Sequence, residues 1–208
     1  MLIAGLTGSI ATGKSTVSAI LKDLGAFIVD ADKIARDVVA PGMKAWEEIV
    51  RVFGKDVLQK TGEIDRESLA RIVFNDNVMR SKLEEIIHPE VMRVIDEEIR
   101  SIKSHSSDAV VILDVPLLIE VGMHEGMNEV IVVYCPEDMQ IMRLMIRDNI
   151  SREEALKKVR AQMPIEKKRH LATLLIDNSA TVDETCKQVE VAYARLRLKA
   201  IEGAGTSS

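Results

Sequence analysis

Short apolar runs alternate with longer segments of helical periodicity along this chain of 208 residues. Continuous apolar runs, without polar residues at every second position, are typical of strands covered on both faces of a sheet. Such runs occupy residues 2–6, 26–29, 109–113 and 129–135, with a weaker one at 174–176. The pattern predicts an α/β fold with three layers, in which helices flank a central, mostly parallel five-stranded sheet.

Helices are predicted where apolar residues recur with a period of 3.6. These segments are residues 14–24, 31–39, 45–53 and a long stretch at 78–103 that we expect to be interrupted at Pro89. Two further starts carry the Ser/Thr-x-x-Glu spacing of a capping box, Ser151 with Glu154 and Thr181 with Glu184. They predict helices at about 152–162 and about 182–199.

The segments group into one expected domain, residues 1–202, followed by a disordered tail at 203–208. Within the domain we expect a helical insertion at about 42–104, where an acceptor would bind, and a helical lid at about 136–170. The lid segment is dense in Arg and Lys. For most of these cations the alternative interpretation, a solvated helical face, is favoured.

Composition limits the possible partners. With 47% hydrophobic and 29% charged residues the chain can bury one substantial core, while a net charge of -5, a pI near 5.5 and 3% aromatic residues argue against nucleic-acid binding. We expect no membrane association, because no leader or apolar span is recognisable. The two distant cysteines, Cys135 and Cys186, suggest a reduced cytoplasmic protein. We expect the protein to be a monomer or weak homo-oligomer.

The segment from Gly8 to Ser15 matches the phosphate-binding pattern G-x-x-x-x-G-K-S and stands between a predicted strand and a predicted helix. Its glycines allow backbone N–H groups to surround an anion at the positive end of the helix. Lys14 would reach the β- and γ-phosphates of ATP, and the Ser15 hydroxyl would ligate Mg²⁺. The residues expected to bind ATP here are Gly8, Ala11, Thr12, Gly13, Lys14, Ser15 and Thr16.

Acidic residues follow two of the predicted strands. Asp30 and Asp32 close the second strand, which we expect beside the phosphate loop, where a carboxylate can accept the proton of an attacking hydroxyl. Asp32 is the candidate base, and Asp30 has the alternative role of capping the next helix. Asp114 ends the third run and could hold the metal's hydration shell or cap a turn.

These motifs, with others in the same order, resemble the dephospho-coenzyme A kinase family over about residues 2–178. The resemblance rests on Gly5-Leu-Thr-Gly8, the phosphate loop, Val29-Asp-Ala-Asp-Lys-Ile-Ala-Arg36-Asp-Val-Val, Ile64-Asp-Arg66, Ile72-Val-Phe74, His88-Pro-Glu-Val91, Asp114-Val-Pro-Leu-Leu-Ile-Glu120, Arg143-Leu144, Arg147-Asp148, Ala161-Gln162, Arg169 and Ile176-Asp-Asn178. It implies a P-loop kinase fold and ATP-dependent phosphorylation of the ribose 3′-hydroxyl of dephospho-coenzyme A.

The resemblance also implies roles for particular residues. Asp32 would be the base, Arg143 and Arg147 would approach ATP from the lid, and Asn178 would belong to the ATP-binding residues. The acceptor site would be lined by Thr7, Arg36, His88, Leu117 and Leu118. Other interpretations remain: His88 could end a helix before Pro89, and the two leucines could belong to the core.

Two loop positions depart from the family's usual pattern, because Ser9 and Ala11 replace common glycines. We expect the loop to bind phosphate despite these changes if both residues have negative φ. Rival functions are a kinase for another nucleoside or nucleotide and, from a different class, an interaction module gated by ATP. A GTPase is disfavoured, since the guanine-selecting Asn-Lys-x-Asp pattern is absent.

Overall fold

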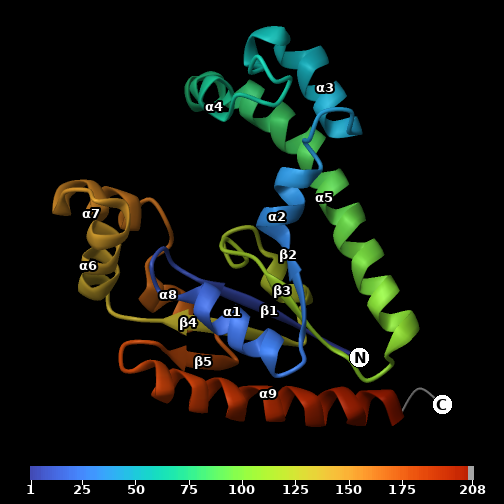
Figure 1. The fold of residues 1–208 in the computed structure, drawn as a ribbon, viewed down its shortest axis with the longest axis vertical. Helices are drawn as coiled ribbons and strands as arrows, with labels where there is room; N and C mark the ends of the chain where they lie inside the picture. The colour runs from blue at the N-terminus through green and yellow to red at the C-terminus, as the bar shows by residue number, and fades with distance from the viewer. Residues whose placement is uncertain (206–208) are drawn as a thin grey trace. The chain divides into compact units, whose positions relative to one another are not determined.

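The computed structural model describes residues 1–205 and has the α/β architecture that the apolar runs predict (Figure 1). The strands are β1 (Leu2–Gly8), β2 (Phe27–Asp30), β3 (Val110–Asp114), β4 (Glu129–Tyr134) and β5 (Leu174–Asp177). The α-helices are α1 (Lys14–Asp23), α2 (Ala31–Asp37), α3 (Lys44–Phe53), α4 (Arg66–Asn75), α5 (Asn77–His105), α6 (Glu137–Asp148), α7 (Arg152–Arg160), α8 (Ile165–Arg169) and α9 (Val182–Gly205). Short 3₁₀ turns lie at η1 (Lys55–Val57) and η2 (Met123–Gly126).

Within residues 1–205 the five strands form one sheet in the order β2-β3-β1-β4-β5. The pairs that β1 makes with β3 and β4, and the pair of β4 with β5, are parallel. Leu6 is therefore in register with Asp114, and Gly8 with Val133. The carboxyl ends of these strands meet at one edge of the sheet, which is where ligands of open α/β sheets bind.

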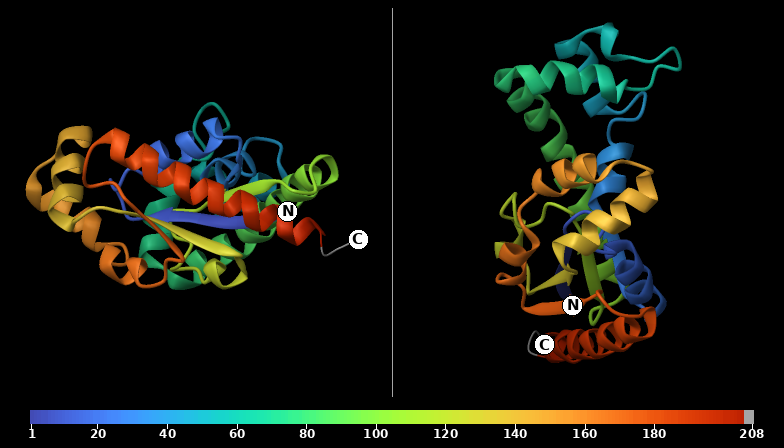
Figure 2. Two further views of the ribbon diagram at one scale, coloured as in Figure 1. Left: turned by 90° about the horizontal axis from the view of Figure 1, so that it is seen from below. Right: turned by 90° about the vertical axis from the view of Figure 1, so that its left-hand side faces the viewer.

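The main core fills one face of the sheet. Alternate residues of β1, β3, β4 and β5 pack there against α1 and α9, and α9 runs across this face (Figure 2). The opposite face of β1 is covered by the segment after β3, where Leu118 is fully buried and approaches Gly5. Strands covered on both sides explain why their sequences are continuously apolar.

The sheet order corrects one expectation about the site. We predicted that the second strand lies beside the phosphate loop, but β3 is the neighbour of β1 and β2 lies beyond it. Sequential strands are often not spatial neighbours, because a crossover helix can carry the chain past an empty position that a later strand fills. Asp114, rather than Asp32, therefore ends the strand next to the loop.

Two expectations about helices also need correction. The helix α5 is continuous across Pro89, although this residue lacks an N–H and its ring crowds the preceding turn. His88 therefore does not end a helix. At the C-terminus α9 includes residues 203–205, which we expected to be disordered, while 206–208 lie outside the described residues.

The helix starts follow the sequence closely. Ser151 and Glu154 form the predicted capping box, and the Thr181 and Glu184 side chains make the same reciprocal bonds. Asp30 caps α2 by accepting a hydrogen bond from the Lys33 N–H, at 2.9 Å. A side chain that satisfies first-turn N–H groups stabilises the helix entrance by about 1 kcal/mol.

The chain divides into two compact units, residues 1–29 with 101–208, and residues 30–100. The first contains the main core and α6 to α9. The second, which we call the helical unit, has its own core around Ile49, Val57, Ile64 and Leu69. There the Trp46 indole donates to the Gly62 carbonyl at 2.9 Å.

The loop between β1 and α1 uses two left-handed residues. Gly13 has a φ of 91° and precedes the first turn of α1, and Ala11 has a φ of 62°. Ala11 therefore does not meet the condition of negative φ. Its Cβ crowds the following carbonyl in this conformation, which costs about 1–2 kcal/mol in an L-residue. The side chain is in turn packed against α6 and α7, together with Ile10.

We predict that Gly5→Ala destabilises the protein by about 1–3 kcal/mol, because an added methyl overpacks the core. A Cβ at Gly5 would lie 2.4 Å from Leu118 Cδ2. The control is Gly126→Ala, where a Cβ meets no atom within 4 Å. The midpoint of urea unfolding should fall in the first variant and stay unchanged in the second. Equal midpoints would contradict this account of the β1 face.

Ala11→Gly should leave stability unchanged or raise it slightly. It relieves the left-handed strain of about 1–2 kcal/mol and adds unfolded-state entropy worth about 0.4–1 kcal/mol. The same substitution at Ala70, exposed within α4, should cost about 1 kcal/mol. Urea unfolding measures both. If the two variants lose the same stability, Ala11 is not strained.

Candidate active site

The phosphate loop is a tight turn held by its own hydrogen bonds. The Ser9 carbonyl accepts from the Thr12 N–H at 3.2 Å and from its hydroxyl at 2.9 Å. Gly8 leaves no room for a side chain, since a Cβ would lie 2.6 Å from Thr12 Oγ1. The loop leads into α1, and the first N–H groups of a helix lack the i−4 carbonyl partners that later ones have. In α1 the Thr16 N–H donates to the carbonyl of the N-cap residue Gly13 at 3.0 Å. This end of α1 is therefore suited to an anion.

Two side chains from distant elements hold the Thr12 carbonyl. The Asn178 amide, directly after β5, donates to it at 2.7 Å, and Arg143 Nη1 on α6 donates at 3.4 Å. Arg143 Nη2 also donates to the Asn178 carbonyl at 2.8 Å. Asn178 is buried and its amide oxygen accepts from the Thr185 hydroxyl. We call this arrangement the Thr12 clamp.

The clamp also explains Gly13. A Cβ at this position would stand 2.0 Å from the Asn178 amide nitrogen, in addition to the unfavourable positive φ. The structure thus brings the predicted ATP-binding residues Thr12, Gly13 and Asn178 together with Arg143. Ser15 and Thr16 lie in the exposed first turn of α1.

Lys14 points to the end of β3, where its ammonium is hydrogen-bonded to Asp114. The Asp114 side chain is 7% exposed and that of Lys14 is 21% exposed. A phosphate-binding cation and a candidate metal-shell acid are therefore in direct contact.

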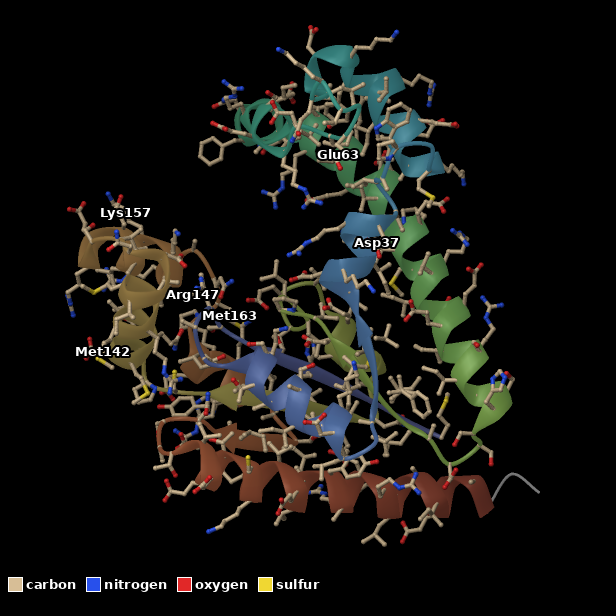
Figure 3. The ribbon with its side chains drawn as sticks, in the orientation of Figure 1. Asp37, Glu63, Met142, Arg147, Lys157 and Met163 are labelled. Atoms are coloured by element: carbon tan, nitrogen blue, oxygen red, sulfur yellow. The ribbon has the colours of Figure 1, made fainter. Side chains whose placement is uncertain are left out.

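Arg147 is the second lid arginine, and its guanidinium is paired with a neighbouring carboxylate (labelled in Figure 3). Arg147 Nε donates to Asp148 Oδ1 at 2.8 Å, and Lys158 Nζ donates to Oδ2 at 3.0 Å. The hydrogen bond from Arg147 and that from Lys158 lower the pKa of Asp148 to about 2. The hydrogen bonds of Arg147 therefore go to Asp148 and not to the Thr12 clamp.

The acceptor-side residues of the first unit have different surroundings. The Thr7 hydroxyl donates to the Pro116 carbonyl at 2.8 Å. Leu118 is fully buried and fills the core beneath Gly5, which supports the alternative interpretation of this residue. Leu117 is 43% exposed and therefore does not belong to the buried core.

The other acceptor-side residues belong to the helical unit. Asp32 and Arg36 are exposed on α2, one turn apart. Asp30 is occupied as the cap of the same helix, because its side chain accepts from the Lys33 N–H. His88 is exposed on α5.

Sequence reasoning missed Lys168, Glu120 and the contact role of Gln162. Lys168 is completely buried and its ammonium pairs with Glu120 Oε1 at 2.8 Å. Gln162 Oε1 accepts from the Ile10 N–H in the phosphate loop at 2.7 Å. A weak signal existed in the pattern, because Lys168 stands three residues after the buried Ile165 and therefore on the same helix face.

The donors near the loop suit a magnesium ion that is bound together with nucleotide. Among residues 1–205 no three His, Cys, Asp or Glu side chains gather into a metal-binding group. Mg²⁺ is usually held by one or two protein ligands, with the remaining sites taken by waters and substrate phosphates. The Ser15 hydroxyl and the Asp114 carboxylate are oxygen donors of that kind.

Cys135 carries no sign of reactivity. It is buried after β4, and burial raises the pKa of its thiol, so that the nucleophilic thiolate is disfavoured. In the described part of the chain no helix is long and apolar enough to cross a membrane.

Comparison with known proteins agrees with this arrangement. The family model described as dephospho-CoA kinase matches residues 2–184. A dephospho-CoA kinase from Carboxydothermus hydrogenoformans is 48% identical over 187 residues, which are 90% of each chain.

Solved structures agree as well. TT1252 from Thermus thermophilus is 36% identical with a TM-score of 0.80, covering 94% of this chain and 97% of its own. A dephospho-CoA kinase from Campylobacter jejuni is 30% identical with a TM-score of 0.71, covering 95% and 98%. With its phosphate loop, its sheet order and these relatives, the chain belongs to the dephospho-CoA kinase family.

Proposed function

We propose that this protein transfers the γ-phosphoryl group of ATP to the ribose 3′-hydroxyl of dephospho-coenzyme A, giving coenzyme A and ADP. The observation that carries the proposal is the contact of Lys14 with Asp114 at the N-terminal end of α1, because it joins a phosphate-binding cation to an acid at the neighbouring strand tip. Family membership supports the choice of acceptor.

Phosphoryl transfer depends mainly on positioning and on positive charge around the transferred group. The first-turn amides of α1 and the Lys14 ammonium would bind the β- and γ-phosphates. Lys14 would exchange its bond to Asp114 for bonds to phosphate oxygens. Arg143, already fixed at the Thr12 carbonyl, would add charge beside the loop. These groups stabilise negative charge that grows in the transition state.

Magnesium would be held by the Ser15 hydroxyl and, through its hydration shell, by Asp114. When bound, the ion neutralises charge on the phosphate oxygens. Asp114 is buried and ends the strand beside β1, so it would lie close to a nucleotide on the loop. The Asp114 carboxylate would then accept hydrogen bonds from water molecules of the metal shell.

Asp32 would act as the general base. It would accept the proton of the 3′-hydroxyl as that oxygen attacks the γ-phosphorus, with Arg36 and His88 contributing to acceptor binding from the same unit. This role requires Asp32 to lie within hydrogen-bond reach of the attacking hydroxyl. Closure of the lid only when the acceptor is bound would limit hydrolysis, because water is the competing nucleophile.

The lid would contribute through Arg147. In the structure this side chain is held by Asp148, at a surface where it is 58% exposed. A bound triphosphate offers a more highly charged partner than a single carboxylate. We propose that Arg147 leaves Asp148 for the nucleotide when α6 and α7 close.

The cellular setting proposed for this reaction is the cytoplasm. Cys135 and Cys186 are both free thiols. Unpaired cysteines suit a reducing compartment.

Lys14→Met and Asp32→Asn should each lower the rate of ADP formation by at least about 10²-fold, through lost charge stabilisation and lost base catalysis. The control for the second is Asp30→Asn on the same helix, which keeps a capping side chain. A coupled ADP-release assay, with circular dichroism to verify folding, measures the effect. An Asp32→Asn enzyme as fast as the Asp30→Asn control would remove Asp32 from the mechanism.

The acceptor is tested directly by offering dephospho-coenzyme A, AMP, adenosine and shikimate in the same ADP-release assay. We expect kcat/KM to be highest for dephospho-coenzyme A by at least about 10²-fold, since a site that hydrogen-bonds its substrate strongly rejects analogues lacking those groups. Faster transfer to AMP or adenosine would favour a nucleotide kinase. ATP binding without transfer to any acceptor would favour the gated interaction module.

A further inference from the structure

Lys168 is unusual because its long cationic side chain is completely buried. It lies on α8 with 0% exposure and is the largest fully buried side chain among the described residues. Lys168 belongs to the basic segment at 136–170, for most of whose cations the sequence favours a solvated helical face. Unlike such cations, it is buried. An ammonium removed from water is costly unless it is paired and hydrogen-bonded. Its partners therefore indicate what the burial achieves.

The ammonium joins α8 to the segment after β3. It donates to the Pro116 carbonyl at 3.0 Å and to Glu120 Oε1 at 2.8 Å. The Pro116 carbonyl also accepts from the Thr7 hydroxyl, near the end of β1. Residues 116–120, which we call the acceptor turn, are thus tied to β1 and α8 at the same point.

The same carboxylate reaches the phosphate loop through the segment before α8. Glu120 Oε1 accepts from the Met163 N–H at 3.4 Å. The Met163 carbonyl accepts from the hydroxyl of the loop residue Ser9 at 3.3 Å. Met163 is labelled in Figure 3. Gln162 Oε1 accepts from the Ile10 N–H. The end of the lid segment, the phosphate loop and the acceptor turn therefore share one hydrogen-bonded junction.

We propose that Lys168 and Glu120 are positioning residues for phosphoryl transfer, holding the acceptor turn and the lid end in one arrangement with the phosphate loop. The inference rests on the proposed function and extends it to residues remote from the motif. An apolar pair of similar volume would often stabilise a fold as well as a buried ion pair does. A buried polar network instead specifies one arrangement. Here Glu120 uses Oε1 for these bonds, while its Oε2 is buried without a hydrogen-bond partner.

The electrostatics agree with a link to the nucleotide. Burial lowers the pKa of Lys168, Glu120 raises it, and the charge of Lys14 lowers it further. The two ammonium groups therefore repel each other across the junction. A triphosphate bound by Lys14 would offset that repulsion and strengthen the junction when ATP is present.

The test compares Lys168→Met with Lys199→Met as a matched control. Lys199, on α9, also pairs with a buried carboxylate, that of Glu129, which is 2% exposed. Both variants should lower Tm. We expect only Lys168→Met to lower kcat/KM for dephospho-coenzyme A, by about 10–100-fold, because a displacement of about 1 Å at the reacting groups has an effect of that size. If the two variants keep equal activity, the proposal is overturned.

Charge balance and positioning are separated by the double variant Lys168→Met with Glu120→Gln. Removing both charges should restore most of the Tm that Lys168→Met loses, because no unpaired buried charge remains. The kcat/KM should stay low, because the Pro116 carbonyl still lacks its ammonium partner. Recovery of both quantities would reduce the pair to a structural role. Lys168→Arg, which keeps the charge and the donors, should retain more activity than Lys168→Met.

Hydrogen exchange provides a readout that does not depend on the acceptor. In Lys168→Met, or in Glu120→Gln should the former fail to fold, amides of residues 7–11, 115–121 and 161–168 should exchange faster. In Lys199→Met they should not. Unchanged exchange in these segments would overturn the junction itself. A wild-type enzyme that does not phosphorylate dephospho-coenzyme A would instead overturn the proposed function, with the exchange result unaffected.

Discussion

The active site depends on one constraint, which is the fixed direction of the Thr12 carbonyl. A loop that binds phosphate must turn its N–H groups inward and therefore its carbonyl groups outward. Here the outward carbonyl is held by Asn178 and Arg143, from elements far apart in the sequence. The left-handed Gly13 and Ala11 complete the turn. The shape of the loop consequently depends on residues at the end of β5 and on α6.

The sheet order distributes the chemistry around that loop. Because β3 rather than β2 lies beside β1, Asp114 contacts Lys14, and the segment after β3 covers the opposite face of β1. The base proposed for the reaction belongs to the helical unit, whose own apolar core makes it a compact body. In the proposed mechanism, nucleotide binding and acceptor activation therefore use residues of different units.

Buried charge has two different uses in the first unit. Glu129 pairs with Lys199 and Arg195 of α9 and so connects that helix to the sheet. These partners do not belong to the phosphate loop. Glu120 binds Lys168 and reaches the phosphate loop through Met163 and Ser9. Both pairs are costly to desolvate. The two carboxylates differ in what their partners connect: Glu129 connects α9 to the sheet, whereas Glu120 connects α8 to the phosphate loop.

The sequence alone determined the local features: continuous apolar runs gave the strands, Ser151 and Thr181 gave helix starts, and the order of Gly8, Gly13, Lys14 and Ser15 gave the phosphate loop. These features depend on neighbours within a few residues, so they can be recognised in the chain. Only the tertiary structure decided the position of β3 beside β1, the burial of Lys168 and the left-handed Ala11. Those outcomes depend on contacts between residues far apart in the chain, such as Lys14 with Asp114 and Lys168 with Glu120, which no local pattern encodes.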